Sequence, residues 1–98
     1  MKYIILKAET MAGEYAFPFI FPDRVVHADA CVHFKRSVME SMPPGTEVTL
    51  HSAGFVSFRN GLTCIRGSET LGIERQPEPN QRDARIFMYS ESMGGLMT

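Results

Sequence analysis

Apolar and polar residues alternate most regularly in the first third of the chain. Four aromatic residues stand at two-residue spacing directly before a segment with helical periodicity: Tyr15, Phe17, Phe19 and Phe21. Residues at this spacing point to one face of an extended strand, so they form an apolar stripe that a helix or a partner must cover. The pattern predicts a strand over residues 14–21. Pro18 cannot donate a hydrogen bond to a neighbouring strand, which places this strand at a sheet edge or at a bulge.

A helix is predicted directly after this strand, over His27–Met42, because apolar residues there recur on one wide arc. The arc contains Ala28, Cys31, Val32, Phe34, Val38, Met39 and Met42. Pro43 and Pro44 cannot continue the helix and end it. Before the aromatic strand, residues 2–8 predict a first strand, and its continuous apolar middle indicates burial on both faces.

A strand pattern returns after the helix, over residues 46–58. Its first half alternates, with Val48 and Leu50 directed inward. Gly54 interrupts the alternation and indicates a bulge or the close approach of another backbone.

A hairpin is predicted at the end of this strand. Asn60 and Gly61 favour a two-residue turn with positive φ at both positions. Such a turn would place Arg59 opposite Leu62 and Phe58 opposite Thr63.

The C-terminal third contains fewer regular patterns. Residues 68–73 favour a short strand or a capped turn, and residues 74–83, with two prolines, favour a loop. Residues 84–90 are rich in Ile, Phe, Met and Tyr and predict a closing strand rather than a helix, and residues 94–98 predict a frayed tail. The predicted fold is a single α+β domain over residues 1–93. It has an antiparallel sheet of about five strands with one helix packed on it, in the order ββαβββ.

Length and charge restrict the function classes. A chain of 98 residues is near the lower limit for one self-sufficient hydrophobic core, so we expect one domain. The net charge is −1 and the two halves are balanced, so no basic or acidic arm indicates a polycationic or polyanionic partner. The apolar run Tyr3–Leu6 is too short for a signal-peptide core or a membrane span, and we expect a cytoplasmic protein without a cofactor.

Four residues carry the candidate metal or catalytic chemistry: His27, Cys31, His51 and Cys64. These residue types would form a tetrahedral zinc site if they converged, although their spacing differs from the close pairs of known structural zinc sites. A cysteine with a histidine base would make a nucleophile, but neither cysteine lies in a known catalytic motif. A small enzyme or metal-binding protein is the alternative prediction. Two buried, reduced thiols explain the cysteines more simply.

Ala53–Phe58 (AGFVSF) resembles the end of the first ribonucleoprotein sequence of RNA-recognition motifs, whose aromatic residues stack on bases. Ala53 stands in place of the first stacking aromatic residue, and the predicted turn leads into a strand where that fold has a helix. Nucleic-acid binding is therefore a further alternative.

Three longer segments resemble small uncharacterised proteins encoded by bacteriophages and prophages. They are Phe17–Cys31 (FPFIFPDRVVHADAC), Ser52–Phe58 (SAGFVSF) and Gly67–Ile73 (GSETLGI). The resemblance implies an accessory protein of a mobile element and no particular activity.

Lys35, Arg59 and Arg66 are the candidate binding residues. Lys35 projects near the middle of the apolar arc, so its ammonium group reaches solvent, pairs with an acid or contacts a partner. Arg59 and Arg66 flank the predicted hairpin. Small size and the phage resemblance favour a non-catalytic protein-binding module, a modulator or inhibitor of host machinery. The expected partner is a host protein and not a membrane. Nucleic acid is a less favoured partner, and a second copy of the chain is left open as a partner.

Overall fold

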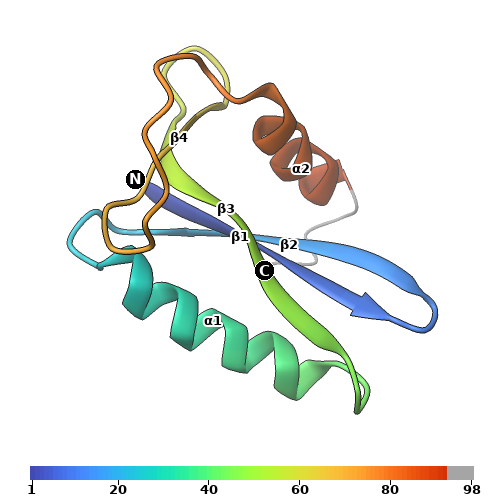
Figure 1. Ribbon diagram of the computed structural model, residues 1–98. Helices are drawn as coiled ribbons and strands as arrows, with labels where there is room; N and C mark the ends of the chain where they lie inside the picture. Colours follow the sequence, from blue (N-terminus) through green and yellow to red (C-terminus); the bar gives the residue numbers. More distant parts are fainter. Residues whose placement is uncertain (93–98) are drawn as a thin grey trace.

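A four-stranded antiparallel sheet forms the middle layer of the molecule, and one helix covers each of its faces (Figure 1). The computed structural model describes residues 1–92. The elements are β1 (Lys2–Thr10), β2 (Gly13–Phe21), α1 (His27–Ser41), β3 (Glu47–Ser57), β4 (Thr63–Arg66) and α2 (Gln81–Ser92). The strand order in the sheet is β2-β1-β3-β4. Neither helix is both long and apolar enough to cross a membrane, as far as residues 1–92 are concerned.

Strand β1 lies inside the sheet and is buried on both faces, as its apolar run predicted. Tyr3, Ile4, Ile5 and Leu6 are all fully buried. Ile4 and Leu6 pack under α1 with Ala30 and Val38, and Tyr3 and Ile5 pack under α2 with Phe87. The protein therefore has two apolar clusters, separated by the sheet.

The aromatic stripe of β2 meets α1, which confirms the predicted contact between strand and helix. The rings of Phe19 and Phe34 stack with centroids 4.3 Å apart, and Phe21 lies 6.2 Å from Phe34. Tyr15, at the far end of the stripe, is exposed. Pro18 lies on an edge strand, as predicted, where its missing N–H group leaves the ladder to β1 intact.

Helix α1 has nearly the predicted bounds, but its buried face is narrower than the predicted arc. Val32 and Met39 are exposed, whereas Ala30, which the arc omitted, is buried. The α1 side that packs on the core cluster carries Ala30 and Val38, with Cys31 and Phe34 partly buried beside them.

A bulge in β3 determines which of its residues face each helix. Leu50 pairs with Leu6 and Ser52 pairs with Ile5, so His51 is an extra residue between them. The side chains on the α1 face are therefore at even positions before the bulge and at odd positions after it, as Leu50 and Ala53 show. The alternation predicted for Val48 and Leu50 is confirmed.

The hairpin between β3 and β4 is longer than predicted. Ser57, not Phe58, pairs with Thr63, so five residues form the connection. Gly61 has φ of 82°, but no residue other than glycine has positive φ within residues 1–92, so the two-residue turn through Asn60 is wrong. The loop contains an isolated bridge between Arg59 and Gly61, and Asn60 between them does not have positive φ.

The segment predicted as a closing strand, residues 84–90, belongs to α2, so the sheet has four strands and the order is ββαββα. Asn80 begins this helix: its Oδ1 accepts a hydrogen bond from the N–H of Asp83 (3.0 Å), and its carbonyl accepts one from Ala84 (3.1 Å). The asparagine cap gives the first amides of the helix a hydrogen-bond acceptor, whereas in a strand these amides would have to bond to a neighbouring strand. The stabilisation by the cap outweighs the strand propensity of Ile86 and Phe87. The tail predicted for residues 94–98 lies outside the described residues.

Helix α2 is joined to the sheet by one buried carboxylate. The Asp83 carboxylate, 2 % exposed, accepts hydrogen bonds from the hydroxyl of Tyr3 (2.5 Å) and from that of Ser52. Asp83 also lies in the first turn of α2, where the helix dipole favours a negative charge. The two hydroxyl donors and the positive end of the helix dipole thus compensate the Asp83 carboxylate for its lost hydration.

Phe34→Ala should lower the free energy of unfolding by about 2–3 kcal/mol, because it removes a ring that is half-buried against Phe19. Urea denaturation measures the loss, and Phe58→Ala, which truncates an exposed ring, is the control. Equal stability of the two variants would contradict the packing described for α1.

Asp83→Ala should destabilise the protein by about 2–4 kcal/mol, because two buried hydroxyl groups lose their acceptor. Asp29→Ala is the matched control, since Asp29 is an exposed carboxylate in the first turn of α1. The control should lose less than about 1 kcal/mol. Similar losses in thermal melting for both variants would show that the buried hydrogen bonds do not hold α2.

Candidate functional site

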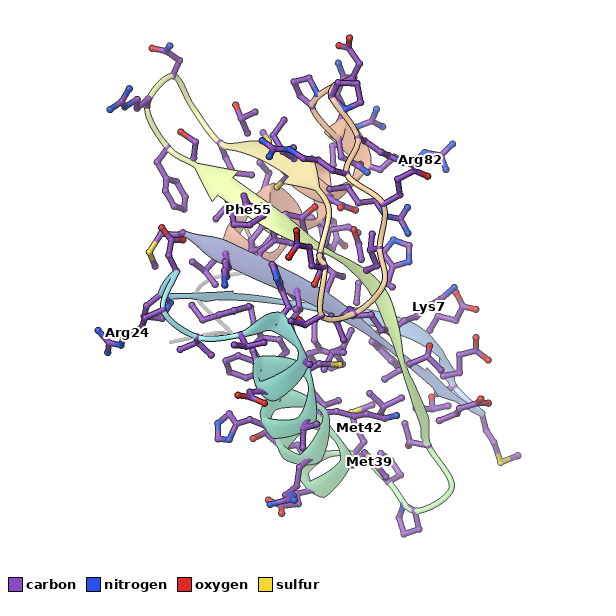
Figure 2. The ribbon with its side chains drawn as sticks, turned by 60° about the vertical axis from the view of Figure 1, so that its left-hand side comes forward. Lys7, Arg24, Met39, Met42, Phe55 and Arg82 are labelled. Atoms are coloured by element: carbon purple, nitrogen blue, oxygen red, sulfur yellow. The ribbon has the colours of Figure 1, made fainter. Side chains whose placement is uncertain are left out.

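A pocket of about 300 Å³ opens at the N-terminal end of α1. We call it the α1 pocket; the residues that matter for its chemistry are Lys2, His27, Phe55, Ser68, Thr70 and Arg75. They come from the start of β1, the start of α1, the end of β3 and the loop between β4 and α2. This loop descends beside the start of α1 (Figure 1), and Figure 2 shows Phe55 at that end of the sheet, with Met39 and Met42 near the opposite end of α1.

The loop after β4 forms one wall of the pocket and has a defined backbone. Ser68 and Ile73 exchange backbone hydrogen bonds of 2.9 and 2.8 Å, and the Ser68 hydroxyl accepts one from the N–H of Leu71. Residues 68–73 are therefore the capped turn that was one of the two predictions. The Thr70 hydroxyl oxygen accepts a hydrogen bond from the N–H of Ala28 (3.1 Å), which attaches this turn to the first turn of α1.

Gly67 sets the position of Arg75 at the other end of this loop. A Cβ atom on Gly67 would lie 2.9 Å from the Cα atom of Arg75, so a side chain would force the two limbs of the loop apart. The N–H of Gln76 donates to the carbonyl of Arg66 (2.9 Å) and closes the loop below this contact. The backbone of Arg75 is therefore fixed, and its side chain is one of those that line the pocket.

His27 lies at the base of the pocket, 3 % exposed. Its Nε2 is 2.8 Å from the carbonyl oxygen of Gly54, and its ring meets Phe21 and Phe55 edge to face. Burial lowers the pKa of His27 below its ordinary value of 6.5; the hydrogen bond to Gly54 opposes this shift, and the Lys2 ammonium adds to it. The ring is therefore neutral at pH 7.

The tautomer of His27 follows from its partner. A carbonyl oxygen only accepts, so Nε2 carries the proton and Nδ1 carries the lone pair. Nδ1 has no hydrogen-bond partner among the described residues. Every fully buried side-chain nitrogen or oxygen in residues 1–89 has one, so part of Nδ1 is accessible, and His27 is one of the residues that line the α1 pocket.

Gly54 can lie this close to the backbone of β4 because it has no side chain. A Cβ atom there would overlap the Ile65 carbonyl and lie 2.9 Å from the Cα atom of Arg66. The close backbone approach predicted for Gly54 is confirmed, while the bulge is at His51.

The pocket has more free hydrogen-bond donors than acceptors. Lys2 Nζ donates to the carbonyl of Val25 (2.9 Å) and keeps two further donors. Neither Lys2 nor Arg75 forms an ion pair with another described residue. The ion pairs among the described residues are Met1–Asp23 and Lys7–Glu14. Val26, at the N-cap of α1, supplies no side-chain cap, and Thr70 accepts the hydrogen bond of the Ala28 amide instead.

The predicted binding residues lie on three different elements. Lys35 is exposed on α1, where it borders a shallow hollow with Val32 and Met39. Arg59 is exposed in the β3–β4 connection, and Arg66 is half-buried at the end of β4, directly before the pocket loop. The structure does not gather the three side chains into one of its pockets.

The alternative metal or catalytic set is not brought together. Cys31 packs in the cluster under α1 and Cys64 in the cluster under α2, on opposite faces of the sheet, and His51 is exposed. Among the side chains that the structure describes, residues 1–89, no group of three or more His, Cys, Asp or Glu is placed to share a metal ion.

Both thiols are also poor nucleophiles. Burial raises the pKa of Cys31, and burial together with the Asp83 carboxylate raises the pKa of Cys64 to about 12. The reactive form of cysteine is the thiolate, which neither residue holds at neutral pH. The expectation of two buried thiols holds for Cys64, whereas Cys31 is half-buried.

The AGFVSF segment does not form a base-stacking surface. Ala53 is fully buried under α1, and although Phe55 and Phe58 are exposed, helices cover both faces of the sheet that would display them. An RNA-recognition sheet needs one open face.

Comparison of the chain with protein-family models, curated proteins and solved structures finds no match. The assignment of a site therefore rests on the geometry alone.

Sequence reasoning identified His27 as a candidate, but it did not identify Lys2 or Arg75. Both are single cations without a motif, and their proximity to His27 depends on the pairing of β1 with β3 and on the loop after β4. Asn80 and Asp83, three residues apart, carried a capping signal that would have identified α2.

His27 should make the protein less stable as the pH falls below 6.5. The unfolded chain binds a proton at His27 near pH 6.5, whereas the folded chain binds it only at lower pH, so the unfolded state gains protons first. Urea denaturation between pH 7.5 and 5.5 should show a steeper loss for the wild type than for His27→Gln. Parallel curves would contradict a depressed pKa of His27.

Proposed function

We propose that this protein is a non-catalytic binding module that recognises a protein partner through the α1 pocket. In keeping with the phage resemblance of its sequence, it acts as a small modulator of a host protein in the host cytoplasm. The observation that carries the proposal is the pocket itself, in which a buried neutral histidine and two unpaired cations stand beside exposed apolar side chains.

The rim of the pocket has the composition of a protein interface. Phe55 is 41 % exposed and Val26 is 39 % exposed, and both border the pocket. Aromatic residues and arginine carry most of the binding energy in protein interfaces, and Arg75 lies on the same rim. Exposed apolar groups beside unpaired donors favour a partner that supplies both an apolar side chain and acceptors.

Catalysis has weaker support at this site. Among the pocket residues, Ser68 is the best candidate for a nucleophile. Its oxygen, however, accepts a hydrogen bond from Leu71, and no hydrogen bond to His27 activates it. Binding needs only the donors, the acceptor and the apolar rim that the pocket offers.

Affinity capture from a host lysate tests the proposal. The double variant Phe55→Ser with Arg75→Glu should retain less than about one tenth of the wild-type capture, because it removes an aromatic anchor and reverses a charge. Lys35→Met is the control on the exposed side of α1 and should capture as the wild type does. Arg59→Ala with Arg66→Ala tests the hairpin residues.

Thermal melting must first show that each variant is folded. Undiminished capture by the folded pocket variant would reject the pocket as the binding surface. A loss confined to Lys35→Met or to the arginine pair would move the surface to α1 or to the hairpin.

A further inference from the structure

We propose that the α1 pocket binds the carboxy-terminal residue of a partner chain, with its carboxylate on Lys2 and Arg75, its amide N–H on Nδ1 of His27 and its side chain against Phe55. The inference rests on the proposed function and names the chemical group that the pocket recognises. It follows from the pattern of donors, acceptor and apolar surface around one cavity.

The donors of the pocket select a carboxylate. Lys2 and Arg75 stand against one acid, Glu69, which is exposed on the turn of the loop, so the pocket has an excess of positive charge. The hydroxyl groups of Ser68 and Thr70 use their oxygens as acceptors toward the backbone and keep their protons for a ligand. A guanidinium group can bind a carboxylate with two parallel hydrogen bonds.

His27 restricts the ligand further, because its free nitrogen accepts rather than donates. The lone pair on Nδ1 repels an anion without a proton to donate, such as sulfate, but it matches an N–H group next to a carboxylate. In the last residue of a polypeptide, the amide nitrogen and the carboxylate carbon are both bonded to the same Cα atom. A free amino terminus fits poorly, since its charge would meet Lys2 and Arg75.

The apolar part of the pocket fits the side chain of that residue. Val26, Phe55 and Ile73 border the cavity. Its volume of about 300 Å³ is at the small end of the range for ligand sites, which suits one residue and the peptide unit before it rather than a long peptide.

Three small probes separate these contributions. N-acetyl-leucine carries the carboxylate, the N–H and the side chain, N-acetyl-leucinamide lacks the charge, and N-acetyl-N-methyl-leucine lacks the N–H donor. Each is titrated into the full-length ¹⁵N-labelled protein at pH 7.5, and amide chemical shifts are followed by NMR. N-acetyl-leucine should move the signals of His27, Phe55 and Thr70 to saturation.

The matched compounds and variants should bind more weakly. Loss of the carboxylate and loss of the N–H should each raise Kd. Loss of the carboxylate should raise it by about tenfold, as expected for a hydrogen bond to a charged group. Arg75→Gln should raise Kd for N-acetyl-leucine by a similar factor. Arg36→Gln, which removes an exposed arginine from α1 outside the pocket, should leave Kd unchanged.

Three results would overturn the inference: equal binding of N-acetyl-leucinamide, saturating shifts elsewhere in the protein, or no saturation up to about 20 mM. These results differ from failure of the proposed function. If Phe55→Ser with Arg75→Glu abolishes capture while N-acetyl-leucine does not bind, the pocket still contacts the partner, but not through a chain terminus.

Discussion

The structure depends on the burial of β1 on both faces. Tyr3, Ile4, Ile5 and Leu6 leave no side of this strand for water, so the sheet needs a cover on each face. Helix α1 provides one cover and α2 the other, and the interior position of the strand follows, since an edge strand would expose its unpaired backbone. Tyr3 adds a requirement of its own, because its buried hydroxyl needs an acceptor, and burial with the neighbouring carboxylate of Asp83 raises its pKa. The carboxylate of Asp83 supplies that acceptor and so fixes where α2 lies on the sheet.

The same strand positions the pocket through its pairing with β3. The extra residue at His51 reverses the alternation of β3, which sends Ser52 to Asp83 and Phe55 to His27. Without the bulge, each of these side chains would point to the opposite face. The polar contact under α2 and the histidine site beside α1 are therefore two consequences of one irregularity in the sheet.

Much of the fold could be predicted from local patterns, because strict alternation and helical periodicity determine elements without reference to distant residues. The aromatic strand, the edge position of Pro18, the bounds of α1 and the close approach at Gly54 belong to this class. The strand predicted over residues 84–90 was wrong because strand propensity was weighed without the cap at Asn80. The five-residue hairpin could not be predicted, because its register depends on the pairing of Ser57 with Thr63 rather than on the preference of Asn60 and Gly61. The α1 pocket depends on contacts between segments far apart in the chain, which periodicity does not report.

The start of α1 contributes both to the stability of the fold and to the proposed binding pocket. A helix usually begins with a side chain that caps its first amides, but Val26 offers none. Thr70, 42 residues away from Ala28, supplies one acceptor from the loop after β4. This contact completes the helix and also brings the pocket loop over His27, whose Nε2 is already committed to Gly54. The hydrogen bond between Ala28 and Thr70 is itself exposed to solvent, whereas the His27 side chain beneath it is buried. A ligand that reaches the His27 ring therefore competes with fewer water molecules there than at the exposed Arg75 side chain.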